Sequence, residues 1–441
     1  MNTQLLFPRL GGTVRAPSSK SEAHRALICA ALSALYGGGN TVRRIRCTDL
    51  NEDIEATVRC LSALGSDIQR TGEDFLVTPI TALPTEAVLD CGESGSTLRF
   101  LLPVCCALGA TENAHEGFTV SLAGHGRLPE RPLSPLYEEL VAHGASLSPM
   151  GSNPLVVRGK LQAGTYAING GVSSQFISGL LFALPLLQGN SHLTVTDKAE
   201  SVPYIDMTLD AIARVTKAVE GALPAFSIVG RNMVTTIPDG MPTPPVGGDW
   251  SGAAFFLAAG LLTPEGGSVT VEGVDVNSRQ GDRAIIDVLT RMGGRFDVRE
   301  RSVVAHASRL HGCDIDATQI PDLAPILAVA ASIAEGDTTI TGAARLRLKE
   351  SDRLATVSAM LKALGGDVTE TEDGLIIHGK PTLQGGVVDA AGDHRIAMSA
   401  AIAATVCQGA VTVCGAEAVA KSYPAFWQDF EALLQEGSIH G

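Results

Sequence analysis

One pattern of hydrophobic residues recurs along the chain. Apolar residues at helical spacing end at a glycine, and two short segments follow in which apolar and polar residues alternate. One copy covers residues 61–77 and stops its helix at Gly65, and a second covers residues 140–157 and stops at Gly144. A glycine after the last apolar residue of a helix is the usual left-handed cap, and alternation around a turn indicates a hairpin. The pattern therefore predicts a repeated unit of helix, glycine stop and β-hairpin.

The same pattern returns further along the chain. Copies cover residues 289–304 and 361–377, and a weaker one around Gly221 covers residues 215–234. Copies that are roughly 70–80 residues apart fit a whole βαβαββ unit better than a short solenoid repeat. Three units before the Pro- and Gly-rich stretch 241–248 and three after it would fill the chain, which makes this stretch the predicted linker. Ordinary α/β sequence with frequent cap glycines is the alternative interpretation.

Composition and charge narrow the class of protein. The chain has 441 residues, of which 45% are hydrophobic and 18% charged. A globular chain of this length is expected to form two or more domains. Its formal net charge of −14 argues against nucleic acid as a partner. An acidic protein that binds an anionic substrate must concentrate positive charge locally.

The nine cysteines favour a reducing, cytoplasmic setting. Their number is odd, they form no C-x-x-C pair, and several lie in apolar runs, which predicts buried free thiols. No cluster of Cys and His has metal-ligand spacing, so we expect no metal. The first residues lack the pattern of a signal peptide. The longest apolar stretches, such as 176–187 and 323–334, are too short or contain proline, so we expect no membrane span.

The segment 17–27 carries the most informative basic residues. Pro17 disfavours helix before it, and the serines that follow can cap a helix that contains Lys20, Ser21 and Arg25. A helix N-terminus offers free N–H groups and a positive dipole end, and Lys20 and Arg25 add charged donors near the same place. The segment therefore predicts an anion site.

Other loops before predicted helices share this character. The loop 90–99 joins two glycines to three hydroxyl side chains, and the loop 124–132 carries two arginines. Lys349 and Arg353 would share a face if a helix began there, with Ser351 as its cap. A plain turn, a solvated loop and a salt-bridged surface turn are the respective alternatives. Further polar groups beside apolar helices are Ser173, Ser174, Gln175, Ser201, Tyr204, Asp322, Asp393, Arg395 and Lys421.

In these segments the sequence resembles the 5-enolpyruvylshikimate-3-phosphate synthase family, also called 3-phosphoshikimate 1-carboxyvinyltransferases. Matching motifs run from the segment at Lys20 to the one at Lys421 and cover nearly the whole chain. The most specific are LPERPL (128–133), VSSQF (172–176), KESDR (349–353) and GDHR (392–395).

The resemblance implies a two-domain, inside-out α/β barrel. Each domain would hold three βαβαββ repeats with helices inside and sheets outside. Residues 14–246 would form the N-terminal domain, and residues 1–13 with 247–441 the discontinuous C-terminal domain. The substrates would bind in a cleft, over which the domains close. The family also suggests a monomer without a cofactor.

The implied reaction moves the enolpyruvyl group of phosphoenolpyruvate to the 5-hydroxyl of shikimate 3-phosphate and releases phosphate, through a tetrahedral intermediate. It belongs to chorismate and aromatic amino acid biosynthesis. By resemblance, Asp322 is the base near the 5-hydroxyl, Glu350 carries a proton, and Lys20 shares acid–base and charge roles. Shikimate 3-phosphate would be bound by Lys20, Ser21, Arg25, Ser173, Ser174, Gln175, Ser201, Tyr204, Asp322 and Lys349. Phosphoenolpyruvate would be bound by Lys20, Gly95, Arg127, Gln175, Arg353, Arg395 and Lys421.

Two departures and three rival functions stay open. Glu93 and Arg345 stand where some members have Asn, so neither is assigned to the site. The related transferase acting on UDP-N-acetylglucosamine often has a Cys in the loop that matches the region around Arg127, and residues 114–135 contain none. A cyclase of RNA ends would share the repeat unit, and a phosphometabolite-binding protein without catalysis would not need Asp322 and Glu350.

The family is also the target of glyphosate, which occupies the phosphoenolpyruvate site. Gly95 corresponds to the glycine whose missing side chain leaves room there, so we expect a sensitive enzyme. Phe100, however, stands where many relatives carry Pro and could narrow the site.

Overall fold

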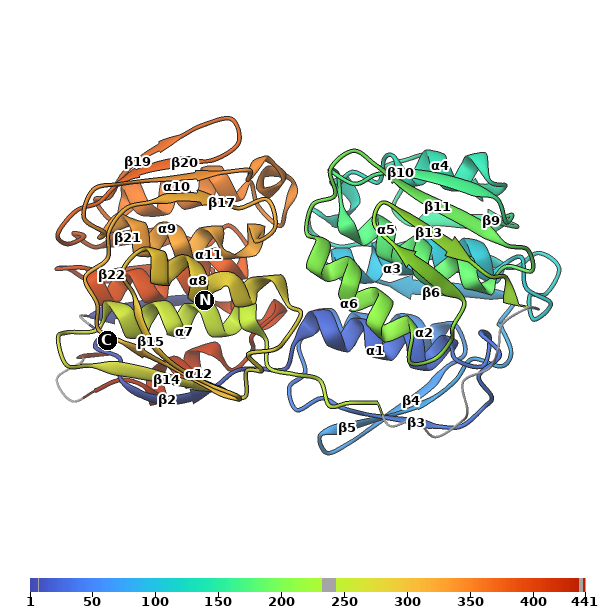
Figure 1. The fold of residues 1–441 in the computed structure, drawn as a ribbon, viewed down its shortest axis with the longest axis horizontal. Helices are drawn as coiled ribbons and strands as arrows, with labels where there is room; N and C mark the ends of the chain where they lie inside the picture. Colours follow the sequence, from blue (N-terminus) through green and yellow to red (C-terminus); the bar gives the residue numbers. More distant parts are fainter. Residues whose placement is uncertain (7, 232–242, 436–438, 441) are drawn as a thin grey trace. The chain divides into compact units, whose positions relative to one another are not determined.

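The computed structural model describes residues 1–6, 8–231, 243–435 and 439–440 (Figure 1). The chain divides into two compact units, residues 1–19 with 247–441 (the C-terminal unit) and residues 20–246 (the N-terminal unit). The expected break between residues 13 and 14 comes too early, because β2 (Gly12–Arg15) pairs in parallel with β14 (Ser268–Glu272) of the C-terminal unit. Of the predicted linker, residues 241 and 242 lie outside the described residues.

The C-terminal unit contains three four-stranded sheets, each with one parallel pair extended by antiparallel strands. Their strand orders are β15-β16-β14-β2, β17-β18-β20-β19 and β21-β22-β1-β23. The third sheet takes β1 from the start of the chain and β23 from its end, which explains why this unit is discontinuous. The remaining strands are β1 (Asn2–Leu6), β15 (Arg295–Arg299), β16 (Ser302–His306), β17 (Asp314–Asp316), β18 (Asp337–Thr341), β19 (Asp367–Glu370), β20 (Leu375–His378), β21 (Gly386–Asp389), β22 (Val411–Cys414) and β23 (Ile439–His440).

Within its described residues, the N-terminal unit repeats this plan with one strand fewer. Its sheets have the orders β3-β5-β4, β6-β7-β9-β8 and β10-β11-β13-β12. The two four-stranded sheets again join a parallel pair to an antiparallel hairpin. The strands are β3 (Arg43–Arg46), β4 (Asp67–Thr71), β5 (Asp74–Thr78), β6 (Glu86–Asp90), β7 (Thr119–Ala123), β8 (Ala145–Leu147), β9 (Leu155–Gly159), β10 (Thr165–Asn169), β11 (Ser191–Thr196), β12 (Val219–Ala222) and β13 (Ala225–Ile228).

Helices alternate with the strands in both units. Within the described ranges, none is both long and apolar enough to cross a membrane. The helices of the N-terminal unit are α1 (Lys20–Leu32), α2 (Glu52–Ala63), α3 (Gly95–Leu108), α4 (Leu136–Ala142), α5 (Ser174–Ala183) and α6 (Val202–Ile212). Those of the C-terminal unit are α7 (Trp250–Leu262), α8 (Ile285–Arg291), α9 (Ala324–Ser332), α10 (Arg353–Ala363), α11 (His394–Ala403) and α12 (Phe426–Ala432).

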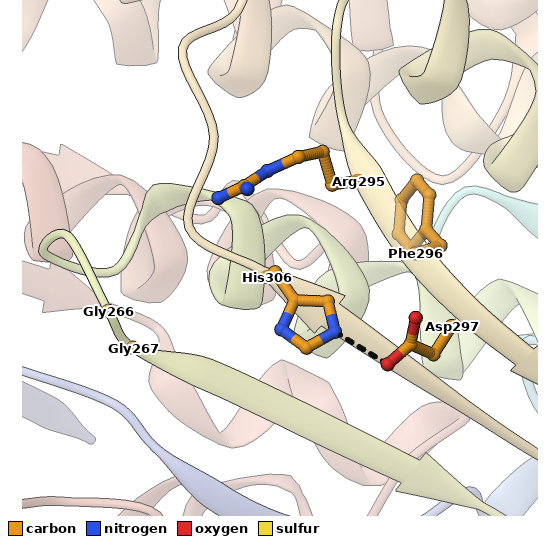
Figure 2. A pocket seen from close by; sticks show the side chains of 6 residues that line it. All are labelled: Gly266, Gly267, Arg295, Phe296, Asp297 and His306. Atoms are coloured by element: carbon orange, nitrogen blue, oxygen red, sulfur yellow. Dashed lines mark hydrogen bonds and ion pairs between the residues drawn. The ribbon is translucent and has the colours of Figure 1, made fainter.

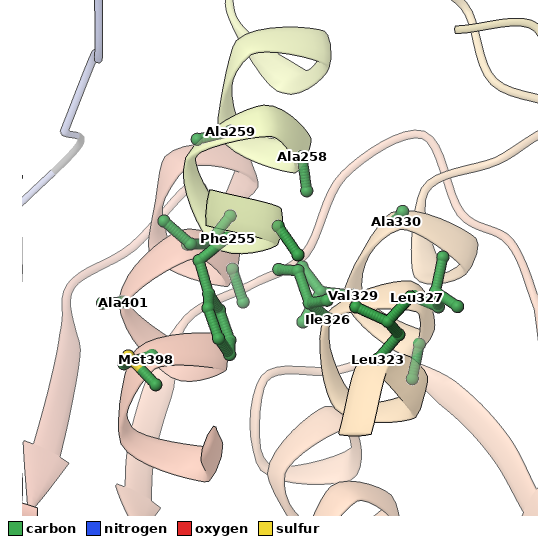
Figure 3. Close-up of a cluster of buried hydrophobic side chains, with 14 of the residues drawn as sticks. Phe255, Ala258, Ala259, Leu323, Ile326, Leu327, Val329, Ala330, Met398 and Ala401 are labelled. Carbon is green, nitrogen blue, oxygen red and sulfur yellow. The ribbon is translucent and has the colours of Figure 1, made fainter. Parts of the chain in front are cut away.

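The helices α7, α9 and α11 form the centre of the C-terminal unit. Every residue of α9 and α11 is buried, and so is every residue of α7 except Leu262. A helix that is apolar on all sides must be enclosed, and Figure 3 shows side chains of all three helices, among them Phe255, Ile326 and Met398, in one buried cluster. Strands such as β11 alternate buried and exposed positions, as expected of a sheet with one solvated face. The predicted arrangement of helices inside and sheets outside is confirmed.

The glycine stops were predicted correctly in four copies of the repeat. Gly65, Gly144, Gly293 and Gly365 all have φ between 82° and 105°, the left-handed region that disfavours side chains. The weaker copy was wrong, because Gly221 lies inside β12 and α6 has already ended at Ile212. Part of that copy, residues 232–234, lies outside the described residues.

A close approach of α5 to α3 depends on Gly179. A Cβ at this position would lie 2.5 Å from the Arg99 carbonyl oxygen and 2.8 Å from Cγ of Pro103. We expect Gly179→Ala to destabilise the protein, because a backbone carbonyl cannot move aside and overpacking costs about 1–3 kcal/mol. That cost outweighs the helix propensity that alanine gains, so thermal unfolding should begin at a lower temperature.

The matched control is Gly164→Ala. Its added Cβ would lie at ordinary distance, 3.5 Å, from the His143 ring. An unchanged melting temperature in the control and a drop of at least about 2 °C in Gly179→Ala are expected. Equal melting curves for both variants would contradict the packing argument.

Candidate active site

A buried arginine organises the polar residues of the C-terminal unit. The Arg353 side chain is only 2% exposed, and three carboxylates surround it. Nε donates to Asp393 at 2.7 Å, Nη1 to Asp322 at 2.9 Å and Nη2 to Glu350 at 2.8 Å. A buried guanidinium is tolerated only when it is paired and hydrogen-bonded in this way.

Three further cations contact the same carboxylates. Arg395 Nη2 lies 3.0 Å from Asp322, Lys349 Nζ lies 3.5 Å from the same residue, and Lys421 Nζ lies 3.6 Å from Glu350. We call these residues the Arg353 cluster: Asp322, Lys349, Glu350, Arg353, Asp393, Arg395 and Lys421. The cluster brings four cations to three carboxylates, and Asp249 and Asp282 also act on Arg395 and help to raise its pKa.

Helix starts supply most of this cluster. Arg353 is the first residue of α10, Arg395 lies in the first turn of α11, and Asp393 caps that helix through the Arg395 N–H. Asp322 lies in the 3-10 helix η5 (Pro321–Leu323) directly before α9. The positive ends of three helix dipoles therefore meet at these side chains.

The expected helix start around Ser351 was wrong. Asp352 caps α10 by accepting from the Ala355 N–H, and Ser351 instead donates to Asp393 at 3.0 Å. Lys349 therefore lies outside α10 and shares no helical face with Arg353. It reaches Asp322 from an extended residue that follows the 3-10 helix η6 (Ala344–Leu348).

Charge sets the protonation of Asp322. Burial alone would raise the pKa of this carboxyl, but Arg395, Lys349 and Arg353 together hold its pKa well below the usual range. Burial works against the charged forms of Arg353 and Arg395 as well, and the neighbouring carboxylates outweigh it and raise both pKa values. The cluster is thus a set of charged groups that stabilise one another.

In the N-terminal unit, Lys20 is the first residue of α1, and its Nζ lies 2.8 Å from Asp53 of α2. Arg25 is 3% exposed and donates to Thr208, to the Tyr204 carbonyl and to the Ser21 carbonyl. Burial lowers the pKa of Arg25 to about 10, which leaves it charged at neutral pH. The predicted residues Lys20, Ser21, Arg25 and Tyr204 therefore lie together.

Gln175 is held from both sides in the same unit. Its Oε1 accepts from Arg99 at 2.9 Å, and its Nε2 donates to Ser96 at 2.9 Å. Ser173 caps α5 by accepting from the Gln175 N–H, and the buried Ser174 follows it. This fixes the amide at the start of two helices, α3 and α5.

Two of the predicted site residues, Ser201 and Gly95, have unusual local backbone conformation or packing. Ser201 has φ 54° and ψ 42°, a left-handed conformation that costs a serine of order 1 kcal/mol or more and that clusters at functional sites. A Cβ on Gly95 would lie 2.8 Å from Nη1 of Arg131. Arg131, rather than the exposed Arg127, is thus the arginine that packs against Gly95.

Four residues of these arrangements were not assigned to the site from the sequence: Asp53, Arg99, Arg131 and Asp393. Asp393 and Arg131 lie inside the motifs GDHR and LPERPL, so the motifs held the signal. Asp53 reads as an ordinary acidic residue in the first turn of a helix. Arg99 reads as part of an apolar helix.

A separate surface pocket lies over β14, β15 and β16 (Figure 2). Its volume is about 330 Å³, and His306 Nε2 lies 3.0 Å from Asp297 at its wall. The lining residues are Gly266, Gly267, Arg295, Phe296, Asp297 and His306. None of the predicted site residues belongs to this pocket.

All nine cysteines are free, and seven of them are buried, as the sequence predicted for most. Burial raises the pKa of thiols such as Cys29 and Cys105. Across the described part of the chain, no three His, Cys, Asp or Glu side chains are arranged to hold a metal ion.

The fold is that of enolpyruvyl transferases. It matches the enolpyruvyl transferase NikO from Streptomyces tendae with a TM-score of 0.73, covering 100% of this chain and 98% of that one, although at 18% identity this likeness concerns the fold alone. The solved EPSP synthase of Acinetobacter baumannii gives a TM-score of 0.76 at 26% identity over 98% of both chains.

The sequence comparisons identify the family. The model for EPSP synthase (3-phosphoshikimate 1-carboxyvinyltransferase) matches residues 7–430. The 3-phosphoshikimate 1-carboxyvinyltransferase of Clostridium acetobutylicum is 41% identical, covering 98% of this chain and 96% of that protein. The chain therefore belongs to the EPSP synthase family, and the resemblance seen in the motifs is confirmed.

The pKa of Asp322 predicts how stability responds to acid. A carboxyl whose pKa is lower in the folded than in the unfolded protein stabilises the fold above its unfolded value, about 3.9. That contribution disappears as the pH falls through the folded pKa. We expect Asp322→Asn to melt below the parent at pH 7, and the gap to close as the pH is lowered from about 5 toward 2.

Melting temperatures of parent and variant across this pH range provide the measurement. Asp314→Asn is the control, since Asp314 is an exposed residue of β17 in the same unit. A constant gap between parent and Asp322→Asn at all pH values would show that the ion pairs of Asp322 do not stabilise the fold.

Proposed function

We propose that this chain transfers the enolpyruvyl group of phosphoenolpyruvate to the 5-hydroxyl of shikimate 3-phosphate and releases phosphate. The observation that supports this proposal most directly is the Arg353 cluster. Its carboxylates Asp322 and Glu350 are suited to proton transfer, and they lie among four cations suited to binding phosphate and carboxylate groups. Membership of the EPSP synthase family supplies the substrates.

The reaction requires proton transfer in two directions. A proton is added to C3 of phosphoenolpyruvate, which makes C2 electrophilic. The 5-hydroxyl loses its proton as its oxygen bonds to C2, and a tetrahedral intermediate results. A proton then leaves the new methyl group, the C2–O bond to phosphate breaks, and the enol ether and phosphate are released. Groups that both donate and accept protons are therefore needed.

In this proposal Asp322 accepts the proton of the 5-hydroxyl, Glu350 carries the proton of C3, and Lys20 contributes acid–base chemistry and charge. Asp322 would be a weak base while its three cationic partners depress its pKa. Substrate phosphate and carboxylate groups compete for Arg395, Lys349 and Arg353. Binding of both anionic substrates therefore raises the proton affinity of Asp322 when a base is required.

The binding roles follow the same chemistry. We infer that Arg353, Arg395 and Lys421 bind phosphoenolpyruvate together with Lys20, Gly95, Arg127 and Gln175. Shikimate 3-phosphate would contact Asp322 and Lys349 and, from the N-terminal unit, Lys20, Ser21, Arg25, Ser173, Ser174, Gln175, Ser201 and Tyr204. Charge-assisted hydrogen bonds of this kind contribute about 1.5–3 kcal/mol each. From the family we further infer a cytoplasmic monomer that acts in aromatic amino acid biosynthesis.

The decisive experiment measures phosphate release from phosphoenolpyruvate with and without shikimate 3-phosphate. Release that depends on shikimate 3-phosphate is expected. Release with UDP-N-acetylglucosamine instead would assign the chain to the related transferase. Tight binding of the substrates with no phosphate release would identify a non-catalytic phosphometabolite-binding protein.

Lys20→Met tests the residue assignments. Because Lys20 is proposed both to bind phosphoenolpyruvate and to transfer protons, we expect turnover to fall by at least about 100-fold with an unchanged fold. Turnover and thermal unfolding are measured together. Lys217→Met, an exposed lysine of the same unit, is the control. Activity of Lys20→Met within a few-fold of the parent would remove Lys20 from the chemistry.

We expect glyphosate to inhibit the parent enzyme, and Gly95→Ala tests the reason for this sensitivity. An added methyl group would crowd the site beside Arg131, and glyphosate is slightly longer than phosphoenolpyruvate. Overpacking costs about 1–3 kcal/mol, so the inhibition constant should rise at least about tenfold, with a smaller rise in KM for phosphoenolpyruvate. Steady-state inhibition of parent and variant provides the measurement.

Arg131→Ala separates two explanations of that result. If the methyl acts directly on the inhibitor, Arg131→Ala alone should not reproduce the resistance. If it acts by displacing the guanidinium, both variants should behave alike. A parent that resists millimolar glyphosate contradicts the sensitivity, and an equal loss of inhibitor and substrate binding contradicts the steric argument.

A further inference from the structure

Two contacts join α1 to α2 on adjacent helical turns. The first is the ion pair of Lys20 with Asp53 at 2.8 Å. The second is a hydrogen bond of 2.7 Å between His24 Nδ1 and Thr57 Oγ1. Both helices place the two partners four residues apart, so the second contact lies directly behind the first along the helix pair. Lys20 is assigned to the chemistry, whereas His24 has no role so far.

The second contact continues to the start of α3. Thr57 Oγ1 lies 2.7 Å from Thr97 Oγ1, and the Thr97 hydroxyl donates to Ser94 Oγ at 2.8 Å. Ser94 is the N-cap of α3 and directly precedes Gly95. All four side chains are at most 1% exposed. We call these residues, His24, Thr57, Thr97 and Ser94, the buried chain.

The hydrogen bonds of the buried chain all run in one direction, from donor to acceptor. Burial lowers the pKa of His24 to about 3, so its ring is neutral at physiological pH and carries a single N–H. Among the described residues Nε2 has no hydrogen-bond partner, and Phe100 packs edge-on near the ring. A buried N–H without an acceptor is rarely tolerated, so the proton belongs on Nδ1. Nδ1 then donates to Thr57, Thr57 to Thr97, and Thr97 to Ser94.

We propose that His24 is a positioning residue, which orients the buried chain and thereby fixes the start of α3 relative to α1. The residues so aligned are Lys20 on α1 and Gly95 on α3. This inference rests on the proposed function, in which both of these residues contact phosphoenolpyruvate. Shikimate 3-phosphate, in contrast, is assigned to Lys20, Ser21 and Arg25 of α1 but to no residue of α3.

The KM values for the two substrates should therefore respond differently when a hydrogen bond of the buried chain is removed. His24→Leu removes the donor at nearly constant volume, and Thr57→Val and Thr97→Val each remove one hydroxyl at nearly constant shape. In each variant KM for phosphoenolpyruvate should rise about fivefold or more, the effect of losing one hydrogen bond, while KM for shikimate 3-phosphate stays within about twofold.

His24→Asn provides the rescue, because its amide nitrogen offers an N–H close to the position of Nδ1. We expect this variant to restore KM for phosphoenolpyruvate to within about twofold of the parent, because it keeps the hydrogen bond to Thr57. Thr111→Val is the matched control. Its buried hydroxyl makes one hydrogen bond, to the Leu108 carbonyl at the far end of α3, and it belongs to no proposed site.

Nitrogen NMR of the His24 ring adds a readout that stability alone would not change. The parent should show Nδ1 protonated and no titration between pH 5 and 8, and Thr57→Val should lose the Nδ1–H signature. Equal rises in both KM values, or an Asn variant no better than Leu, would overturn the positioning role. A parent without activity would instead refute the proposed function, and the NMR result would still report the direction of the chain.

Discussion

The site of the C-terminal unit depends on one buried guanidinium. Arg353 binds Asp393, Asp322 and Glu350 at once, and these residues come from three separate segments of the unit. Removing a partner from a buried ion pair costs about 3–5 kcal/mol, because the remaining charge loses its compensation. The position of each carboxylate is therefore fixed by the arginine they share, and the starts of α9, α10 and α11 are held together through it.

The repeated architecture explains why charges gather at helix starts. The bodies of α9 and α11 are buried and almost wholly apolar, so the charged side chains of these two segments lie at the helix starts. The N-terminal unit follows the same rule, with Lys20 at the start of α1, Gly95 at the start of α3 and Ser174 at the start of α5. Dipoles and unpaired N–H groups at these ends favour anions before any side chain is added.

Features that depend on single residues or short motifs could be predicted from the sequence, whereas contacts between distant segments could not. The glycine stops at four helices were predictable because a positive φ is a property of one residue. The start of α10 was misplaced, since Ser351 and Asp352 are both good caps and a distant residue, Asp393, takes the serine hydroxyl. Asp53 and Arg99 were missed because their partners, Lys20 and Gln175, come from other helices, and nothing in the local sequence specifies such contacts. The motifs supplied the chemistry, whereas the pairing required the fold.

In the proposed function, the Arg353 cluster also links binding to catalysis. The cations proposed to bind the substrates lower the pKa of Asp322, and a strongly stabilised carboxylate is a poor base. The conflict is resolved if the substrate anions take over the same donors, because each new phosphate or carboxylate contact withdraws positive charge from Asp322. A base that gains proton affinity only when both anions are bound would be activated by its own substrates.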